Sequence, residues 1–445
     1  MARSDDDMVA RGIAHSATPL IGAASDLDPL LERIGDARFV LIGEASHGTH
    51  DFYRLRAELT QRLIHDKGFL AVVAEADWPD AYRVNRFVRG QGSDGSAIEA
   101  LQDFLRFPQW MWRNVDVADF VGWLREYDDH VPEPWRKVGF YGLDLYSLHR
   151  SIGAVLAYLQ RVDPAAADRA RERYACFDEL GADPRRYGIS AGLGISEDCE
   201  QQVIAQLVEL QRRRATIVHD DDAEDAFAAE QDARVVVGAE RYYRAMFSNE
   251  VSTWNLRDTH MADTLDAVVG HLERHGEPVK VVVWAHNSHV GDARATEMGA
   301  HGELTLGQLC RQRHRNETVL IGFTTHEGTV TAASDWDAPV ERKRVRPALD
   351  GSYEQLFHAT DVPRFLLIMR QLGEAAGGLR EPRLERAIGV VYRPDTERSS
   401  HYFNARLPAQ FDAIIHLDET RAVEPLERTA HWGRDELPET FPTGM

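Results

Sequence analysis

The chain has 445 residues, of which 43% are hydrophobic and 28% are charged, and its formal net charge is −21. This composition is typical of a soluble globular protein with one large domain or two ordinary ones. The negative charge argues against nucleic acid or an anionic membrane as the main partner. Residues 1–16 lack the apolar core of a signal peptide, and no apolar run approaches the ~20 residues of a membrane span.

The cysteines indicate a reducing environment. Cys176, Cys199 and Cys310 are few, odd in number and far apart in the sequence. This pattern suggests neither a disulfide framework nor a cysteine zinc site. We therefore expect a cytoplasmic protein, and we expect it to be a monomer.

The first buried strand is predicted at Phe39 to Ile42, after a polar lead-in. The turn that follows carries Glu44 and His47, three residues apart, so both side chains can reach one small volume. A carboxylate beside an imidazole can form a base with its orienting partner, or half of a metal site. A polar loop that caps the next helix is the simpler alternative for this stretch alone.

The next helix is predicted over 51–66, with Arg56 at the edge of its apolar stripe. Arg56 could reach back towards the strand ends, or its stem could lie on the surface with the charge in water. A second strand, Phe69 to Ala74, ends in Glu75, which places Glu75 on the same rim of the sheet as Glu44. A third short strand is predicted at Val138 to Tyr141.

Tryptophans lie close to these strand ends in the sequence. Trp78 follows Glu75, and Trp110 and Trp112 interrupt a predicted helical segment. Such residues can wall an apolar pocket, although ordinary packing is their commoner role. Farther along, the acidic run at 219–225 contains metal-ligand residue types, but its crowded like charges favour a solvated loop.

The second half of the chain repeats the arrangement of the first motif. A helix predicted from about 255 to 274 carries Arg257 on its apolar face, so this guanidinium is expected to point inward or at a cleft. The apolar run Val279 to Trp284 then predicts a buried strand, and His286 and His289 follow it. Later strands are predicted at Thr318–Phe323, Thr329–Ala333, Phe365–Ile368, Ile388–Tyr392 and Phe411–Ile415.

The predicted fold class is α/β, with a mixed, largely parallel central sheet flanked by helices and an inserted, mostly helical subdomain. The chain-order organisation is a polar N-terminal lead-in (1–27), a first α/β half of the catalytic domain (28–147), a helical subdomain (148–250), a second α/β half (251–420) and a C-terminal tail (421–445).

Two segments match known sequence motifs, but the predicted secondary structure around them does not fit those motifs. GISAG at 188–192 fits G-x-S-x-G, but Ser190 lacks the buried strand that a nucleophile elbow requires, so a flexible loop is expected. GQGSDG at 90–95 fits G-x-G-x-x-G, but it follows a helix-like segment and is read as a polar turn.

Several segments together resemble the erythromycin esterase family. They are GEASHGTHDFYRLR at 43–56, Gly68, Phe69 and Glu75, YGLDLYS at 141–147, NLRDTHMADTL at 255–265, WAHNSHVGDAR at 284–294 and GTVTAAS at 328–334. The resemblance covers roughly residues 30 to 420. It implies an esterase-like α/β fold with a deep cleft, and hydrolysis of macrolide lactones without a serine nucleophile. The family's essential positions fall on Glu44, His47, Arg56, Glu75, His286 and His289.

Resemblance and chemistry agree on a carboxylic ester hydrolase. His47 is the expected general base for water, Glu44 or Glu75 would orient it, and Arg56, His286 or His289 would stabilise the oxyanion or protonate the leaving alcohol. The expected substrate is a small-molecule ester or a macrolide, whose cleavage would give antibiotic resistance. The expected substrate-binding residues are Arg257, Trp78, Trp110 and Trp112.

Two other hypotheses stay open at this point. A metal-dependent hydrolase could use the same glutamates and histidines on a different ester or amide, and a non-catalytic small-molecule-binding protein could reuse the cleft. We expect no cofactor, and a divalent metal is not favoured, because Arg56 near the carboxylates can compensate their charge. The binding protein is the least favoured, since a binding pocket is mostly apolar with few polar groups.

Overall fold

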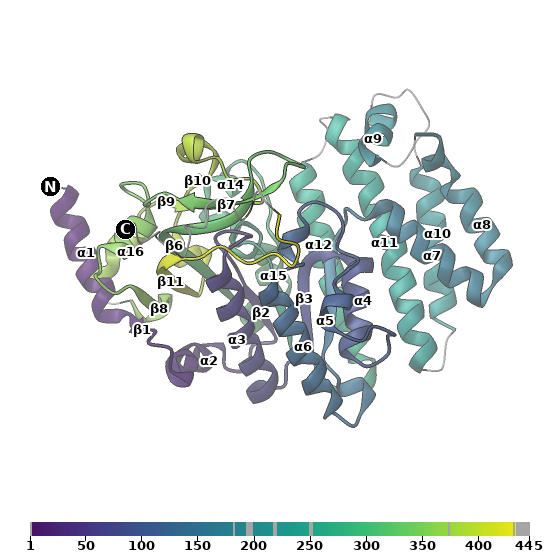
Figure 1. Ribbon diagram of the computed structural model, residues 1–445, viewed down its shortest axis with the longest axis horizontal. Helices are drawn as coiled ribbons and strands as arrows, with labels where there is room; N and C mark the ends of the chain where they lie inside the picture. Colours follow the sequence, from purple (N-terminus) through teal and green to yellow (C-terminus); the bar gives the residue numbers. More distant parts are fainter. Residues whose placement is uncertain are drawn as a thin grey trace, which may run out of the picture.

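The computed structural model describes residues 2–180, 183–192, 199–216, 220–248, 252–372, 374–429 and 432. Its centre is a nine-stranded sheet in which β1, β8, β11, β6, β2, β5, β3 and β4 lie in that order, with β7 paired to β6 (Figure 1). The strands from β11 to β4 run parallel, whereas β1, β8 and β7 pair antiparallel with their neighbours. The predicted mixed, largely parallel α/β sheet is confirmed.

The strands of this sheet are β1 (Thr18–Pro19), β2 (Phe39–Ile42), β3 (Ala71–Asp77), β4 (Gly139–Asp144), β5 (Val281–Trp284), β6 (Thr318–Ala333), β7 (Val340–Val345), β8 (Arg364–Ile368) and β11 (Ala413–Thr420). A separate pair consists of β9 (Arg383–Arg386) and β10 (Tyr402–Ala405). The longer helices are α1 (Ala2–Ser16), α3 (His50–Lys67), α4 (Trp78–Val88), α6 (Val115–Asp129), α7 (Leu148–Val162), α8 (Pro164–Tyr174), α9 (Pro184–Gly192), α10 (Glu200–Arg214), α11 (Asp220–Ser248), α12 (Thr253–Leu272) and α15 (Leu306–His314). Short helices include α2 (Asp28–Ile34), α5 (Ala97–Ala100), α13 (Asn287–Val290), α14 (Glu297–Ala300), α16 (Tyr353–His358), α17 (Glu397–Ser400) and α18 (Leu407–Gln410).

The sheet is buried on both faces, which explains why its central strands are apolar throughout. Along β2, Val40 and Ile42 pack in one hydrophobic cluster with α3, whereas Phe39 and Leu41 pack in a second cluster with α12. Successive side chains of a strand point to opposite faces, so an unbroken apolar run suits a strand covered on both sides. The result is a three-layer α/β/α arrangement.

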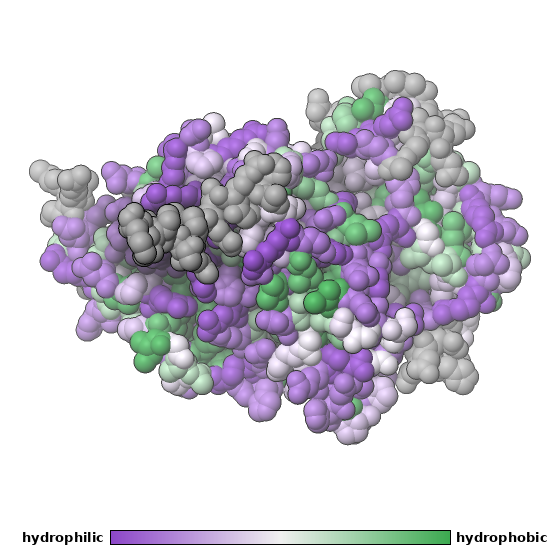
Figure 2. Space-filling view, viewed as in Figure 1, coloured by the Kyte–Doolittle hydropathy of each residue, from purple (hydrophilic) through white to green (hydrophobic). Residues whose placement is uncertain are grey.

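A group of helices lies beside this sandwich. Helices α7 to α11 share a hydrophobic cluster of their own, and α11 packs against α12 and α4 (Figure 1). On the face seen in Figure 2, most surface residues are hydrophilic and the hydrophobic ones form small patches. In the described ranges no helix is long and apolar enough to cross a membrane.

Two of the predicted strands are one. The prediction of separate strands at 318–323 and 329–333 is wrong, because β6 runs unbroken from Thr318 to Ala333. Gly328 makes this possible: its φ is +139°, and a Cβ there would lie 2.0 Å from the Thr420 carbonyl oxygen of β11. The strand predicted at 388–392 is also wrong, since Ile388 and Val391 form only isolated bridges, to Ser46 and Ala333.

Several segments predicted as loops or leads are helical. The N-terminal lead-in contains α1, which buries Val9, Ala10 and Ile13. Ser190 lies in helix α9, so the flexible loop expected there is wrong. In the acidic run, residue 219 and the side chains of 220–222 lie outside the described part. Glu224 of that run is buried and 2.9 Å from His271, so the solvated loop is wrong at this residue.

The cysteine expectation also fails. Cys176 and Cys199 form a disulfide, whereas Cys310 is free and buried. The bridge joins the 3-10 turn Ala175–Leu180, which follows α8, to the N-cap of α10, 23 residues later. Sequence spacing could not show this pairing, because it depends on how the intervening α9 folds back.

The loop that follows β2 is held against β6 at Gly48. Its carbonyl oxygen accepts hydrogen bonds from the backbone N–H groups of Thr331 and Val423, both at 2.9 Å. A Cβ on Gly48 would lie 1.8 Å from the Thr331 carbonyl oxygen, closer than real contacts allow. This loop therefore docks on β6 through a glycine that no larger residue can replace without movement.

We predict that Gly48→Ala lowers the free energy of unfolding by about 2 kcal/mol or more, because the overlap is with backbone. Gly270→Ala is the matched control: Gly270 is exposed on α12 with no atom within 4 Å of the added Cβ. The control should be stabilised by roughly 0.5–1 kcal/mol. Urea unfolding measures both, and equal stabilities for the two variants would contradict this docking.

Candidate functional site

The turn after β2 builds a carboxylate–imidazole pair. Glu44 is fully buried, and its Oε1 accepts a hydrogen bond from His47 Nδ1 at 2.9 Å. A carboxylate can only accept, so His47 carries its proton on Nδ1 and a lone pair on Nε2. His47 lines a cavity at this edge of the sheet. The pair therefore has the arrangement of a general base with its orienting partner.

Arg56 contacts the Glu44 side of this pair, away from the cavity. It projects from α3, is fully buried, and its Nη1 lies 3.2 Å from Glu44 Oε2. The rings of Tyr53 and Trp284 lie 4.5 and 4.7 Å from its guanidinium carbon. The alternative that Arg56 lies on the surface is therefore wrong. Neither Arg56 nor Glu44 lines the cavity, so Arg56 can act there only through Glu44 and His47.

A second unit joins the ends of β3 and β4. Glu75 Oε2 accepts the backbone N–H of His286 at 2.8 Å, and its Oε1 accepts Arg257 Nη2 at 2.7 Å. Arg257, from α12, also donates to both oxygens of Asp144, at 3.0 and 2.7 Å. Burial acts to raise the pKa of Glu75, but the charges of His289 and Arg257 outweigh it and hold the pKa well below its usual range. Glu75 is thus an anion at any working pH.

His289 belongs to this second unit. Its Nδ1 donates to Asp258 at 2.9 Å, its Nε2 lies 2.9 Å from Arg257 Nη1, and its ring stacks on Trp254 at 4.4 Å. Burial acts to lower the pKa of His289, but Asp258 and Glu75 raise it above its usual value. Arg257 can only donate, so Nε2 of His289 accepts its N–H and the ring proton lies on Nδ1, towards Asp258.

His286 has the opposite character. It caps the short helix α13, and its Nδ1 accepts the backbone N–H of Ser288 at 3.2 Å. Its ring lies 4.7 Å from that of His47. Burial, followed by the charge of His47, lowers the pKa of His286 to about 3, so its imidazole stays neutral.

The cavity shared by both units has a volume of about 390 Å³. Its aromatic walls come from distant parts of the chain: Phe104, Trp112, Tyr146, Trp254, Trp336 and Phe403. Its polar wall includes Asp77, Asp80 and Arg106. Burial and the neighbouring Asp77 raise the pKa of Asp80 to about 8, so this wall carries less negative charge than its residue types suggest.

Two of the four predicted substrate-binding residues line this cavity, namely Arg257 and Trp112. Trp78 does not, because its ring packs in the core against Tyr141 and Phe227. Trp110 also lies outside the lining, packed edge-on against Phe107.

Sequence reasoning missed other residues of the site. Asp144 ends the third strand, and Trp254 and Asp258 flank Arg257 on α12, so each lies next to a position that was singled out. Asp258 lies three residues before Met261, on the apolar face of the predicted helix. Helical periodicity could therefore have marked it as a buried carboxylate, which needs a partner. Trp336 and Phe403 carry no signal in the sequence.

The glutamates are poor candidates for metal ligands. One oxygen of Glu44 accepts the Nδ1–H of His47 and the other lies 3.2 Å from the Arg56 guanidinium, and both oxygens of Glu75 face N–H groups. A metal ion would have to displace Arg257 from an ion pair that also holds Asp144. In the ranges that the structure covers, no three His, Cys, Asp or Glu donors of the cleft converge closely enough for an ion.

Comparison with known proteins supports the family suggested by the motifs. A family model described as erythromycin esterase matches residues 64–420. Erythromycin esterase type II from Escherichia coli is 23% identical over 423 residues, which cover 90% of this chain and 93% of that protein.

Solved structures share the fold. A protein from Bacillus cereus has a TM-score of 0.78 at 19% identity, over 95% of this chain and 99% of that one. An erythromycin esterase in its open conformation has a TM-score of 0.60 at 18% identity, over 88% of this chain and 93% of that one. With a family model matched over most of its length, the chain belongs to the erythromycin esterase family.

Proposed function

We propose that this hydrolase of the erythromycin esterase type opens carboxylic esters or lactones by direct attack of water, with His47 as the general base. The observation that carries the proposal is the 2.9 Å hydrogen bond from His47 Nδ1 to buried Glu44, on a histidine that lines the cavity. That bond leaves Nε2 free to take a proton from water. A histidine is suited to this step because it titrates near neutral pH.

The unit that contains His47 would activate the water, and the unit that contains Arg257 would stabilise the charge that develops on the substrate. His47 removes the proton of the attacking water, and Glu44 stabilises the imidazolium that forms. Arg257 lines the cavity and lies within reach of a developing oxyanion, which its charge would stabilise. The leaving alkoxide would take from His47 the proton that came from the water, while His289, whose Nε2 accepts from Arg257 Nη1 at 2.9 Å, keeps that guanidinium in position. Glu75 holds Arg257 and His289 in place, and neutral His286 packs beside His47.

The substrate is a small molecule, since a cavity of about 390 Å³ is in the range of ligand pockets. Its aromatic walls suit a bulky, mostly apolar ester. Relatives named erythromycin esterases make a macrolactone the first substrate to test, and with it a role in macrolide resistance. A cytoplasmic location stays a prediction.

A metal-dependent mechanism is the less favoured alternative. Arg56 and Arg257 already neutralise the carboxylates that would serve as ligands. A serine nucleophile at Ser190 is also disfavoured, because Ser190 lies in helix α9 and not at a strand-to-helix turn. A non-catalytic role does not explain a histidine oriented as a base and an ion-paired guanidinium that line one cavity.

We predict that the wild-type protein adds one water to at least one member of a panel of esters and macrolactones, and that His47→Asn abolishes this. Mass spectrometry of the products measures the gain of water. His50→Asn is the matched control, because His50 lies three residues after His47, at the start of α3, but pairs with Asp116 at 2.9 Å. Folded His47→Asn that keeps more than about a tenth of wild-type turnover would remove His47 from the role of base.

A second prediction concerns Arg56 as a positioning residue. Arg56→Lys keeps the charge but loses the planar group stacked between two rings, so kcat should fall at least about tenfold. Arg56→Met also removes the charge that balances ionised Glu44, so kcat should fall at least as far as in Arg56→Lys.

Arg54→Lys is the control for this experiment, since Arg54 on the same helix forms an exposed pair with Glu58 at 2.8 Å. All variants are compared as folded proteins by circular dichroism. Normal kcat in folded Arg56→Lys and in folded Arg56→Met would leave Arg56 with a role in folding alone.

A further inference from the structure

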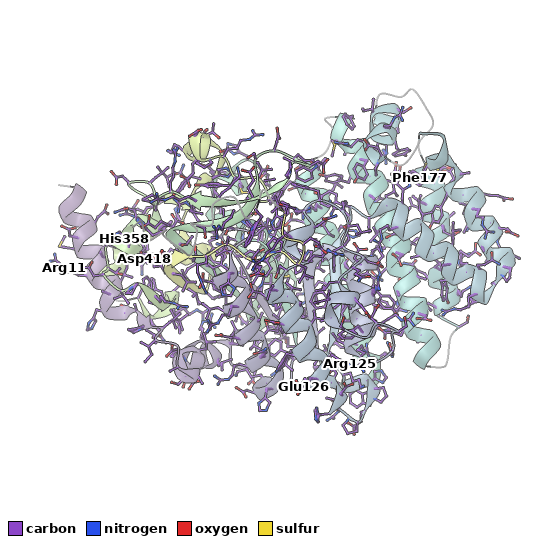
Figure 3. All side chains as sticks on the ribbon, in the orientation of Figure 1. Arg11, Arg125, Glu126, Phe177, His358 and Asp418 are labelled. Carbon is purple, nitrogen blue, oxygen red and sulfur yellow. A yellow bond between two sulfur atoms is a disulfide. The ribbon has the colours of Figure 1, made fainter. Side chains whose placement is uncertain are left out.

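Three side chains of types that can ligate a metal lie close together outside the cleft, on the part of the sheet formed by β6 and β11. His326 lies on β6, Asp418 on β11, and His358 is the last residue of α16. The parallel register pairs Thr325 with Leu417, which sets His326 and Asp418 side by side on neighbouring strands. Figure 3 labels His358 and Asp418, which lie next to each other beside α16 and β11.

The distances suit donors that share one ion. His358 Nδ1 lies 2.8 Å from Asp418 Oδ1, and the rings of His326 and His358 stack with centroids 3.9 Å apart. One donor atom from each of the three residues lies within 4.8 Å of the other two. Two donors on one zinc ion are about 3 Å apart, because each bond is about 2.0–2.1 Å long. The side chain of His358 is 45% exposed, so it can turn to close the remaining gap.

One nitrogen of these side chains has no hydrogen-bond partner among the described residues. His326 is 6% exposed, and its Nδ1 has no hydrogen-bond partner in the part of the chain that the structure covers. A buried imidazole nitrogen without a partner costs stability, so such groups usually have one. A bound ion would give the imidazole a strong interaction that the protein does not supply.

The surroundings resemble the supporting groups of metal sites. His416, fully buried on β11, has its Nε2 3.4 Å from Asp418 Oδ1 and its Nδ1 2.9 Å from the Thr324 hydroxyl. Hydrogen bonds to ligating carboxylates fix their orientation and tune the ion. The rigid strands β6 and β11 thus hold two of the three donors, while α16 brings the third from solvent.

We propose that His326, His358 and Asp418 bind one divalent transition-metal ion of the zinc type. Two imidazoles and a carboxylate form a common zinc ligand set, with water at the open position. The ion would fasten the end of α16 to β6 and β11. The site is separate from the cleft, so it does not depend on the proposed hydrolysis.

The test uses the full-length protein, without a histidine tag, after dialysis against a strong chelator. Isothermal titration with Zn²⁺ should show one equivalent bound per chain. Asp418→Asn and His358→Ala should each weaken binding at least about tenfold. His65→Asn is the matched control and should bind normally, because His65 pairs with Asp66 at 2.9 Å on the exposed face of α3.

A second arm separates this site from the cleft. Glu75→Gln should leave Zn²⁺ binding unchanged, and the chelated wild-type protein should keep any ester hydrolysis it shows. Binding that is lost in Glu75→Gln but kept in His358→Ala would place the ion in the cleft and overturn the proposal. Absence of binding up to about 100 μM Zn²⁺, or equal binding in wild type and Asp418→Asn, would overturn it as well.

Discussion

The site depends on one buried chain of charge, from Arg56 through Glu44 to His47. Glu44 and Arg56 are both fully buried, and neither charge could remain there alone. Removing one partner of a buried ion pair typically costs about 3–5 kcal/mol, because the other is left uncompensated. Arg56 therefore allows an ionised Glu44 inside the core, and the ionised Glu44 fixes the proton of His47 on Nδ1. Without that constraint, His47 would have no fixed tautomer.

The order of the strands brings His47 next to the other polar residues of the cavity. Strands β2, β5 and β3 are neighbours in the parallel sheet, so their carboxyl ends open onto one cavity. β2 delivers His47, β5 delivers His286 and His289, and β3 delivers Glu75. Helix α12 then inserts Arg257 between the strand ends. The base and the cation that would stabilise the oxyanion thus come from different parts of the chain but line the same cavity.

The sequence was sufficient where local pattern determines structure. The apolar runs at 39–42 and 279–284 predicted buried strands, which the structure has at 39–42 and 281–284. The turns after them predicted clustered glutamates and histidines, which the structure brings to one rim. The helix predicted over 51–66 is also present as α3, and Gly68 ends it with a φ of +69°. These features follow from periodicity and from glycine's access to the left-handed region.

Other features could not be predicted, because they depend on tertiary contacts. Trp78 looked suited to a pocket wall, but it turns towards the core cluster around Tyr141. Arg56 could have been a surface residue, and only the packing of Tyr53 and Trp284 around it decides otherwise. The Cys176–Cys199 bridge depends on the path of the chain between its two ends.

The central claim is that water, activated by His47, attacks the substrate carbonyl directly. A single turnover in heavy-oxygen water, with enzyme in excess over an ester substrate and rapid acid quenching, tests it most directly. The account predicts one labelled oxygen in the product acid, no label in the carboxylates of Glu44 or Glu75, and no acyl adduct in the intact mass of the protein. An acyl adduct on the quenched protein, or label transferred to either glutamate, would contradict it.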